Sequence, residues 1–254
     1  MKRVIAALLL AAAFPAALSA ASPEKPEKIP LYLWSGQDPY RTVEAAADEA
    51  YEPGDLVVVA GVWRPGGLAG GAVLHYTIRE PAVGEKNALT EAPVDVRYFY
   101  VDVLPPDAPA ETPGGFARAR GLVADDDLYA YAYILRPETI EALPPPAWSE
   151  EAVRATLSAL RKEIRKIKLE RLTGEVHHEY NKGYKIVADV AAAEIELEAV
   201  DYERGLAVAR ARFERLPPAD SDVLFRYLDV YVVTDSETGE PRWAVACVGG
   251  FYLE

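Results

Sequence analysis

The stretch TGEVHHEYNKGYKIV, residues 173–187, contains the side chains that come nearest to a metal site in this sequence. Neighbouring residues of a strand face opposite ways, so His177 and the histidine after it cannot share a metal ion. Glu175, His177 and Glu179 do share one face, and carboxylate and imidazole groups are ligands for divalent metals. The same spacing fits a hairpin strand with a solvated polar face, which needs no ligand, and we favour that interpretation. A metal-dependent hydrolase that uses this strand is the alternative function.

A stripe of tyrosines forms the second group. In LYAYAYILRP, Tyr129, Tyr131 and Tyr133 point to one face of a predicted strand, and Tyr98 and Tyr100 alternate in the same way in VDVRYFYVDV. A tyrosine offers a ring for stacking and a hydroxyl for hydrogen bonding, which suits a glycan or a peptide. The alternative is that these rings are packed under a helix or a second domain, which is the commoner use of aromatic stripes.

Two arginines extend the predicted ligand-binding face. Arg118 and Arg120 share one face of the predicted strand GFARARGLV, where their guanidinium groups could hold a carboxylate or a phosphate. Pairing with nearby acidic side chains at the surface is the plainer expectation. We group both arginines with the tyrosines as candidate ligand-binding residues.

Familiar catalytic motifs do not occur in the sequence. It has no Gly-x-Ser-x-Gly, no His-Glu-x-x-His and no phosphate-binding loop. Cys247 is the single cysteine, so it can form no internal disulfide, and without a nearby histidine it is a poor nucleophile. We therefore predict a protein that is not an enzyme and that uses no cofactor.

The first residues, MKRVIAALLLAAAFPAALSA, predict export. Lys2 and Arg3 precede an apolar run, and Ser19 and Ala21 satisfy the small-residue rule for cleavage after Ala21. No later apolar stretch is long enough to span a bilayer, so we expect a periplasmic or secreted protein without stable membrane insertion. The formal net charge of -13 argues against a nucleic-acid partner.

The sequence LPPPAWSEE, residues 143–151, predicts a domain boundary because three consecutive prolines interrupt both helices and sheets. The expected organisation is a signal peptide over 1–21, a polar lead and a helix over 22–53, a barrel domain over 54–143 and a helix-plus-sheet domain over 144–254.

The predicted second domain begins with a long helix. Ser149 caps it, apolar residues recur at helical spacing from Val153 to Ile167, and Gly174 is placed to end it. The alternating segments that follow predict a curved antiparallel meander of four or five strands. By element order alone, this half resembles the cystatin-like and NTF2-like α+β layouts.

The first domain is predicted to consist mainly of strands. Five segments between residues 56 and 137 are predicted to be strands. The first, LVVVAGVW, is apolar on both faces and is expected to be buried on both sides, and Gly61 inside it indicates a bulge or a sharp bend. A long bent strand that joins two faces is what a small five-stranded barrel requires, so we predict an OB-like barrel. The predicted fold class is therefore α+β, with this barrel followed by a long helix on an antiparallel meander.

At these residues a family resemblance appears. The strands GDLVVVAGVW, VDVRYFYVDV, GGFARARGLV and YAYAYILRP, with the turn Leu104-Pro105-Pro106-Asp107, resemble the OB-fold of the periplasmic haem chaperone of cytochrome c maturation. The resemblance covers about 54–136. That family bonds haem through a histidine just past the last strand, with a tyrosine four residues later, and this chain reads Arg136-Pro137-Glu138-Thr139-Ile140 there. Covalent haem attachment is therefore not implied.

These observations predict an exported binding or envelope-assembly module. Its expected partner is a protein or a glycan of the cell envelope, which it engages through one face of the barrel.

Overall fold

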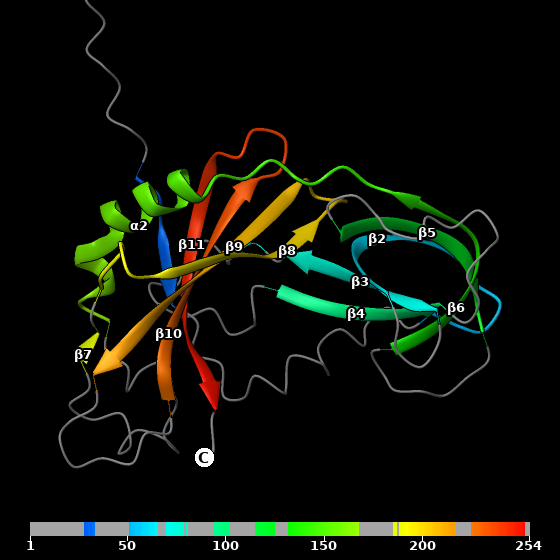
Figure 1. Ribbon diagram of the computed structural model, residues 1–254, viewed down its shortest axis with the longest axis horizontal. Helices are drawn as coiled ribbons and strands as arrows, with labels where there is room; N and C mark the ends of the chain where they lie inside the picture. Colours follow the sequence, from blue (N-terminus) through cyan, green and yellow to red (C-terminus); the bar gives the residue numbers. More distant parts are fainter. Residues whose placement is uncertain are drawn as a thin grey trace, which may run out of the picture.

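The computed structural model shows two β-rich halves that lie side by side, with a barrel at one end and a sheet with a helix at the other (Figure 1). The described residues are 28–33, 51–65, 70–78, 80, 94–101, 115–124, 132–167, 185–186, 188–216 and 225–251.

Five strands form a closed barrel in the order β2-β3-β4-β6-β5. Their bounds are β2 Leu56–Pro65, β3 Gly71–Ile78, β4 Val94–Val101, β5 Phe116–Val123 and β6 Ala132–Ala142. The neighbouring pairs are antiparallel except β4 and β6, which run parallel. Phe99, Val101, Val73 and Leu135 fill the interior and are fully buried. Tyr51, just before β2, packs on Phe99 with a ring-centroid distance of 5.9 Å.

Two glycines allow the barrel to close. A Cβ on Gly61 would lie 1.9 Å from the backbone oxygen of Leu74, and a Cβ on Gly121 would lie 2.3 Å from that of Arg136. The pairing of β5 with β6 shifts its register between Arg120 and Gly121, which is a bulge. Strands that curl into a barrel approach one another closely at such points, and only glycine leaves room for the neighbouring backbone.

The second half is a six-stranded sheet in the order β1-β11-β10-β9-β7, with β8 also paired to β9. Its strands are β1 Leu31–Leu33, β7 Lys185–Ile186, β8 Glu194–Asp201, β9 Leu206–Leu216, β10 Phe225–Asp235 and β11 Pro241–Phe251. The first of these pairs in parallel with the last, so β1 (blue) and β11 (red) lie side by side in Figure 1.

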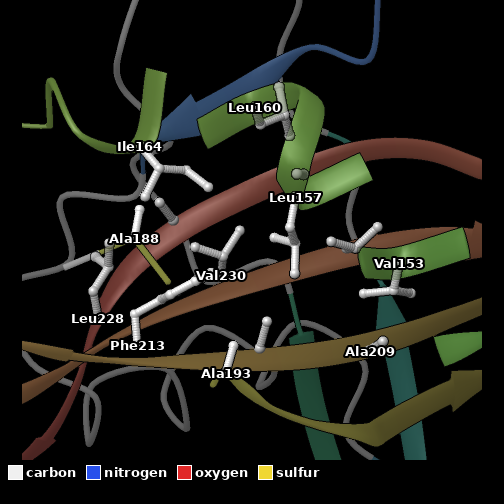
Figure 2. Packing of buried hydrophobic residues seen from close by; sticks show 14 residues of the cluster. Val153, Leu157, Leu160, Ile164, Ala188, Ala193, Ala209, Phe213, Leu228 and Val230 are labelled. Atoms are coloured by element: carbon white, nitrogen blue, oxygen red, sulfur yellow. The ribbon is translucent and has the colours of Figure 1, made fainter. Parts of the chain in front are cut away.

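One face of the sheet is covered by helix α2, Glu150–Ile164, capped by the Ser149 hydroxyl, which accepts from the Ala152 backbone N–H at 3.2 Å. Figure 2 shows how its apolar side chains meet those of the strands. Val153, Leu157 and Ile164 are fully buried, and each contributes roughly 1.5–3 kcal/mol by leaving water. The charged face of the helix also contacts the second half: the Arg161 side chain donates a hydrogen bond to the Ala188 carbonyl at 3.0 Å.

The opposite face of the sheet meets the barrel, and Asp201 makes the central contact. Its side chain is 2% exposed, and its Oδ2 accepts from the backbone N–H of Ile78, the last residue of β3, at 2.9 Å. Its Oδ1 accepts from the N–H groups of Glu203 and Arg204 in the turn after β8, at 3.1 and 2.9 Å. The Arg204 guanidinium in turn donates to the Ile78 carbonyl. Both backbone groups of Ile78 are therefore satisfied by the sheet half.

Apolar contacts complete this junction. Ile78 is buried among Val208, Val233 and Val245 of the sheet. Beside it, the Tyr202 ring lies edge-on to Phe116 with centroids 6.0 Å apart, and its hydroxyl donates to the Pro144 carbonyl at 3.0 Å. The proline-rich segment predicted as a domain boundary is thus bonded to the sheet.

The predicted α+β class is wrong. The described part of the chain is mostly strand, and the helix it contains, α2, has 15 residues. The sheet is also not a simple antiparallel meander, because β1 joins β11 in parallel and β9 pairs with both β7 and β8 along one edge. The alternation of apolar and polar residues along one strand does not reveal such pairings, because they join segments that are far apart in the chain.

The helix also ends earlier than predicted. It stops at Ile164, where i-to-i+3 backbone bonds take over, from Lys166 to Glu163 at 3.0 Å and from Ile167 to Ile164 at 3.2 Å. Tightening of the last turn is a common way to end a helix. The predicted stop at Gly174 and the predicted helix before the barrel lie outside the described residues. Within the described chain, no helix combines the length and apolar character needed to cross a membrane.

Replacing Gly61 by alanine should destabilise the protein by about 2–3 kcal/mol, because the added methyl group collides with backbone rather than with a movable side chain. Gly115→Ala is the control: it places a methyl group in open space, so it suffers only the strain of its left-handed backbone, about 1–2 kcal/mol. Urea unfolding measures both. A Gly61→Ala variant as stable as the native protein contradicts the close approach of β2 and β3.

Replacing Asp201 by asparagine should lower the free energy of unfolding by about 1–3 kcal/mol, because one of its two acceptor oxygens becomes an N–H donor that faces other donors. Glu203→Gln is the matched control, since its side chain is exposed in the same turn. Chemical denaturation of the two variants side by side provides the measurement. Equal midpoints would show that Asp201 does not hold the junction.

Candidate functional site

The outer wall of β2 and β5 carries an exposed apolar patch. Leu56 is 51% exposed, Val58 54% and Leu122 43%, and they are the exposed large hydrophobic residues of the described chain. Leu56 lies directly across from Leu122, and Val58 lies next to Leu56 along the same face. We call Leu56, Val58, Leu122, Arg118 and Arg120 the barrel wall. Clustered exposed apolar side chains mark interaction surfaces more often than scattered ones do.

The predicted arginines lie on this wall. Arg120 lies across from Val58 and forms an ion pair with Glu138 of β6 at 3.1 Å, with both side chains 52% exposed. Arg118 lies across from Ala60, and its charge lowers the pKa of Tyr202 against the larger effect of burial, which raises that pKa to about 12. Exposed pairs of this kind add little stability, so these side chains are available for contacts with a partner.

Tyr133 is half-buried and packs against the interior of the barrel. Its ring stacks on Phe99 with centroids 5.3 Å apart, and its hydroxyl accepts weakly from the backbone N–H of Tyr51 at 3.4 Å. The structure therefore does not place it on an open binding face. Tyr129 and Tyr131, the other two members of the predicted stripe, lie outside the described residues.

Tyr98 and Tyr100 lie on the outside of the barrel. Both are half-buried, and their rings are within 16° of parallel with centroids 6.2 Å apart. We call them the tyrosine pair. They flank Phe99, which points inward, so the structure separates them from Tyr133 and also from the two arginines, which belong to a different wall.

The predicted metal ligands Glu175, His177 and Glu179 all lie outside the described residues, so the metal site and the hydrolase alternative stay predictions. Elsewhere in the described chain, no three histidine, cysteine, aspartate or glutamate side chains are grouped so that they could hold a metal ion.

A group of polar side chains that the sequence analysis did not single out lies on the barrel side of the sheet. Arg212 of β9 contacts Asp229 of β10 through two hydrogen bonds, at 2.9 and 3.2 Å, and its guanidinium lies 5.0 Å from the ring centre of Tyr227. The Asp229 side chain is 3% exposed and that of Arg212 21%. Two residues away on the same face, Arg210 forms an ion pair with Glu196.

Glu198 adds a third carboxylate through a bulge in β8. The pairing of β8 with β9 shifts its register between Leu197 and Ala199, so Glu198 is the extra residue. Its Oε2 lies 3.5 Å from Arg210 Nε, and its side chain is 34% exposed. Burial, and next the charge of Asp229, raise the pKa of Glu198 despite the opposing effect of nearby arginines. Bulges that redirect a side chain are frequent beside functional sites.

The barrel contributes Tyr76 of β3 to the same place. Burial, and then the charge of Glu198, raise the pKa of the Tyr76 phenol to about 12, and the neighbouring Tyr98 adds to the shift. Tyr76 and Tyr98 lie on the same outer face of adjacent strands, on residues diagonal to one another. We call Glu198, Arg210, Arg212, Asp229 and Tyr76 the junction cluster.

The sequence contains one signal for this cluster. ARARFER in β9 and RYLDVYV in β10 place charged and aromatic residues at every second position, on the face opposite the apolar one. This pattern predicts a solvated face. In the structure this face of the sheet is half-buried because the barrel packs against it.

No protein-family model, curated protein or solved structure matches the chain. The predicted resemblance to the haem chaperone family therefore stays a prediction.

Glu198→Gln should leave the protein at least as stable as the native form at neutral pH. Because the folded-state pKa of Glu198 is raised, the folded chain binds more protons than the unfolded chain between the ordinary and the raised value. The native free energy of unfolding therefore falls as the pH rises through that window, and the variant lacks this loss. Denaturation midpoints over a pH series, with Glu203→Gln as control, test this. A variant that is less stable at pH 8 and equal at low pH would show the opposite sign.

Proposed function

We propose that this chain is an exported, non-catalytic binding or assembly module of the cell envelope, and that it engages a partner protein through the barrel wall. The observation that carries the proposal is the exposed patch of Leu56, Val58 and Leu122 on adjacent strands. Export is supported by the N-terminal sequence, with its basic residues, apolar run and small residues.

The wall has the features of a protein interface. Its centre is apolar and its edge carries arginine, a residue enriched at interfaces because its planar group binds carboxylates through two hydrogen bonds. Strand residues on a rigid barrel present these side chains in fixed positions, so little conformational entropy is lost on binding. The wall is the part of the described barrel surface where large apolar groups meet water.

The charge of the wall indicates the chemistry of the partner. Arg118 of β5 lies across from Glu141 of β6, Arg120 pairs with Glu138, and Arg136 beside the wall on β6 lies across from Leu122, so three positive charges meet two negative ones. The wall thus differs from the rest of a chain whose net charge is -13. A partner protein with an apolar patch edged by carboxylates would match it, because each arginine would gain a charge-assisted hydrogen bond.

A glycan is less well supported at this wall. Sugar binding relies on aromatic rings, and the wall has apolar aliphatic side chains instead. Tyr133, the described member of the predicted stripe, is half-buried and stacks on Phe99 of the barrel interior.

Val58→Asp should abolish capture of the partner without destabilising the fold, because the side chain is already 54% exposed. The measurement is cross-linking and affinity capture of the tagged full-length protein from its own cell envelope, followed by binding assays with the purified partner. Loss of affinity should exceed about tenfold, since a charge in the centre of an apolar interface loses its water.

Ala192→Asp is the matched control, because it adds the same charge at an exposed position in the sheet half. It should bind like the native protein. Three outcomes contradict the proposal: capture that survives Val58→Asp, a melting temperature that falls with that substitution, or a dimer of this chain that the substitution dissociates.

A further inference from the structure

We propose a second binding site, separate from the barrel wall, in which the junction cluster and the tyrosine pair together bind a neutral oligosaccharide. The residues come from both halves of the molecule: Glu198, Arg210, Arg212 and Asp229 from the sheet, and Tyr76, Tyr98 and Tyr100 from the outer face of the barrel.

The donor and acceptor groups suit a sugar. Asp229, whose side chain is 3% exposed, accepts two hydrogen bonds from Arg212 and so holds the Arg212 guanidinium in one orientation, with the guanidinium as the donor for a ligand. Glu198 contributes an acceptor, since its carboxylate makes one long contact at 3.5 Å with Arg210 and is two-thirds removed from solvent. A sugar hydroxyl both donates and accepts hydrogen bonds, so neighbouring hydroxyls can contact a carboxylate and a guanidinium at the same time.

The aromatic groups supply the apolar contact that a sugar ring needs. The tyrosine pair has nearly parallel, stacked rings, 16° apart, which form one aromatic surface on the outside of the barrel. Tyr76 lies diagonal to Tyr98 on the adjacent strand, and the charge of Glu198 contributes to its raised pKa, so it links the tyrosine pair to the junction cluster. A chain of sugar units could therefore contact the polar groups at one end and the rings at the other.

Charge balance favours a neutral ligand. Glu196, Glu198 and Asp229 carry three negative charges, and Arg64, Arg210 and Arg212 carry three positive ones, with Arg64 close enough to lower the pKa of both Tyr76 and Glu198. At this site the arginines would repel a cation, and the carboxylates would repel an anion. Neither gains net attraction, whereas a polyol can satisfy groups of both signs.

The bulge at Glu198 supports a binding role for this carboxylate. The extra residue interrupts the ladder of β8 with β9 and brings a carboxylate to a half-buried place beside Asp229, a like charge. Each of these features lowers stability. Groups that cost stability while lying at the meeting of two structural units are typical of binding sites.

The test uses the full-length protein and isothermal titration with three neutral probes, maltohexaose, cellohexaose and chitohexaose. We expect saturable binding of at least one of them. Glu198→Gln should weaken that binding about tenfold, because an amide offers one acceptor where the carboxylate offers two. Tyr100→Ala should weaken it by a similar factor through loss of the ring contact.

Two further measurements separate binding from structural roles. Glu198→Gln should keep or raise the melting temperature while losing affinity, which a purely structural residue does not do. Glu203→Gln and Val58→Asp should bind the sugar like the native protein, so failure of the barrel wall as a partner surface leaves this site intact. Absence of saturable binding to all three probes, or binding that Glu198→Gln leaves unchanged, overturns the proposal.

Discussion

The carboxylate of Asp201 accepts backbone N–H groups from both halves of the molecule, and their relative placement depends on it. A strand that ends against another unit leaves its last backbone groups without a ladder partner, and burying them unpaired would cost several kcal/mol. Asp201 and Arg204 provide those partners for Ile78. With β3 fixed there, Tyr76 on the same strand is brought to Glu198, and the barrel wall is left on a side that the sheet does not cover.

The strands of the barrel could be predicted from local patterns of apolar residues. The expectation that the first of them is buried on both sides was wrong, because Leu56 and Val58 of β2 are exposed. Gly61 was predicted to mark a bulge or a bend, and the structure shows that it lies where the backbone of β3 comes too close for any larger residue. The class of the whole fold was predicted wrongly. Apolar residues at helical spacing after Ser149 predicted a long helix as the main element of the second half. In the structure α2 ends at Ile164, and this half consists mainly of a six-stranded sheet. Pairings such as β1 with β11 depend on tertiary contacts, which no local period encodes.

The candidate sites show the same division. Arg118 and Arg120 were correctly expected to share a face, because a period of two is local information. Whether a tyrosine faces solvent or the core is decided by barrel closure, so the sequence could not separate Tyr133, which packs on the interior, from Tyr100 outside. Glu198 was overlooked altogether. In the sequence EIELEAV it reads as one of several alternating glutamates, and only the register shift beside Leu197 makes it different from Glu196.

The parallel pairing of β1 with β11 links the first described strand to the last one. Bringing together two segments so far apart in the sequence costs conformational entropy, so this pairing forms slowly. While the polypeptide is being synthesised or threaded, Leu31–Leu33 has no partner strand until residues 244–246 arrive. The edge of the sheet is therefore finished late, whichever end emerges first. The pairing of β1 with β11 therefore forms only once residues 244–246 are present, and the sheet edge at β11 stays open until then.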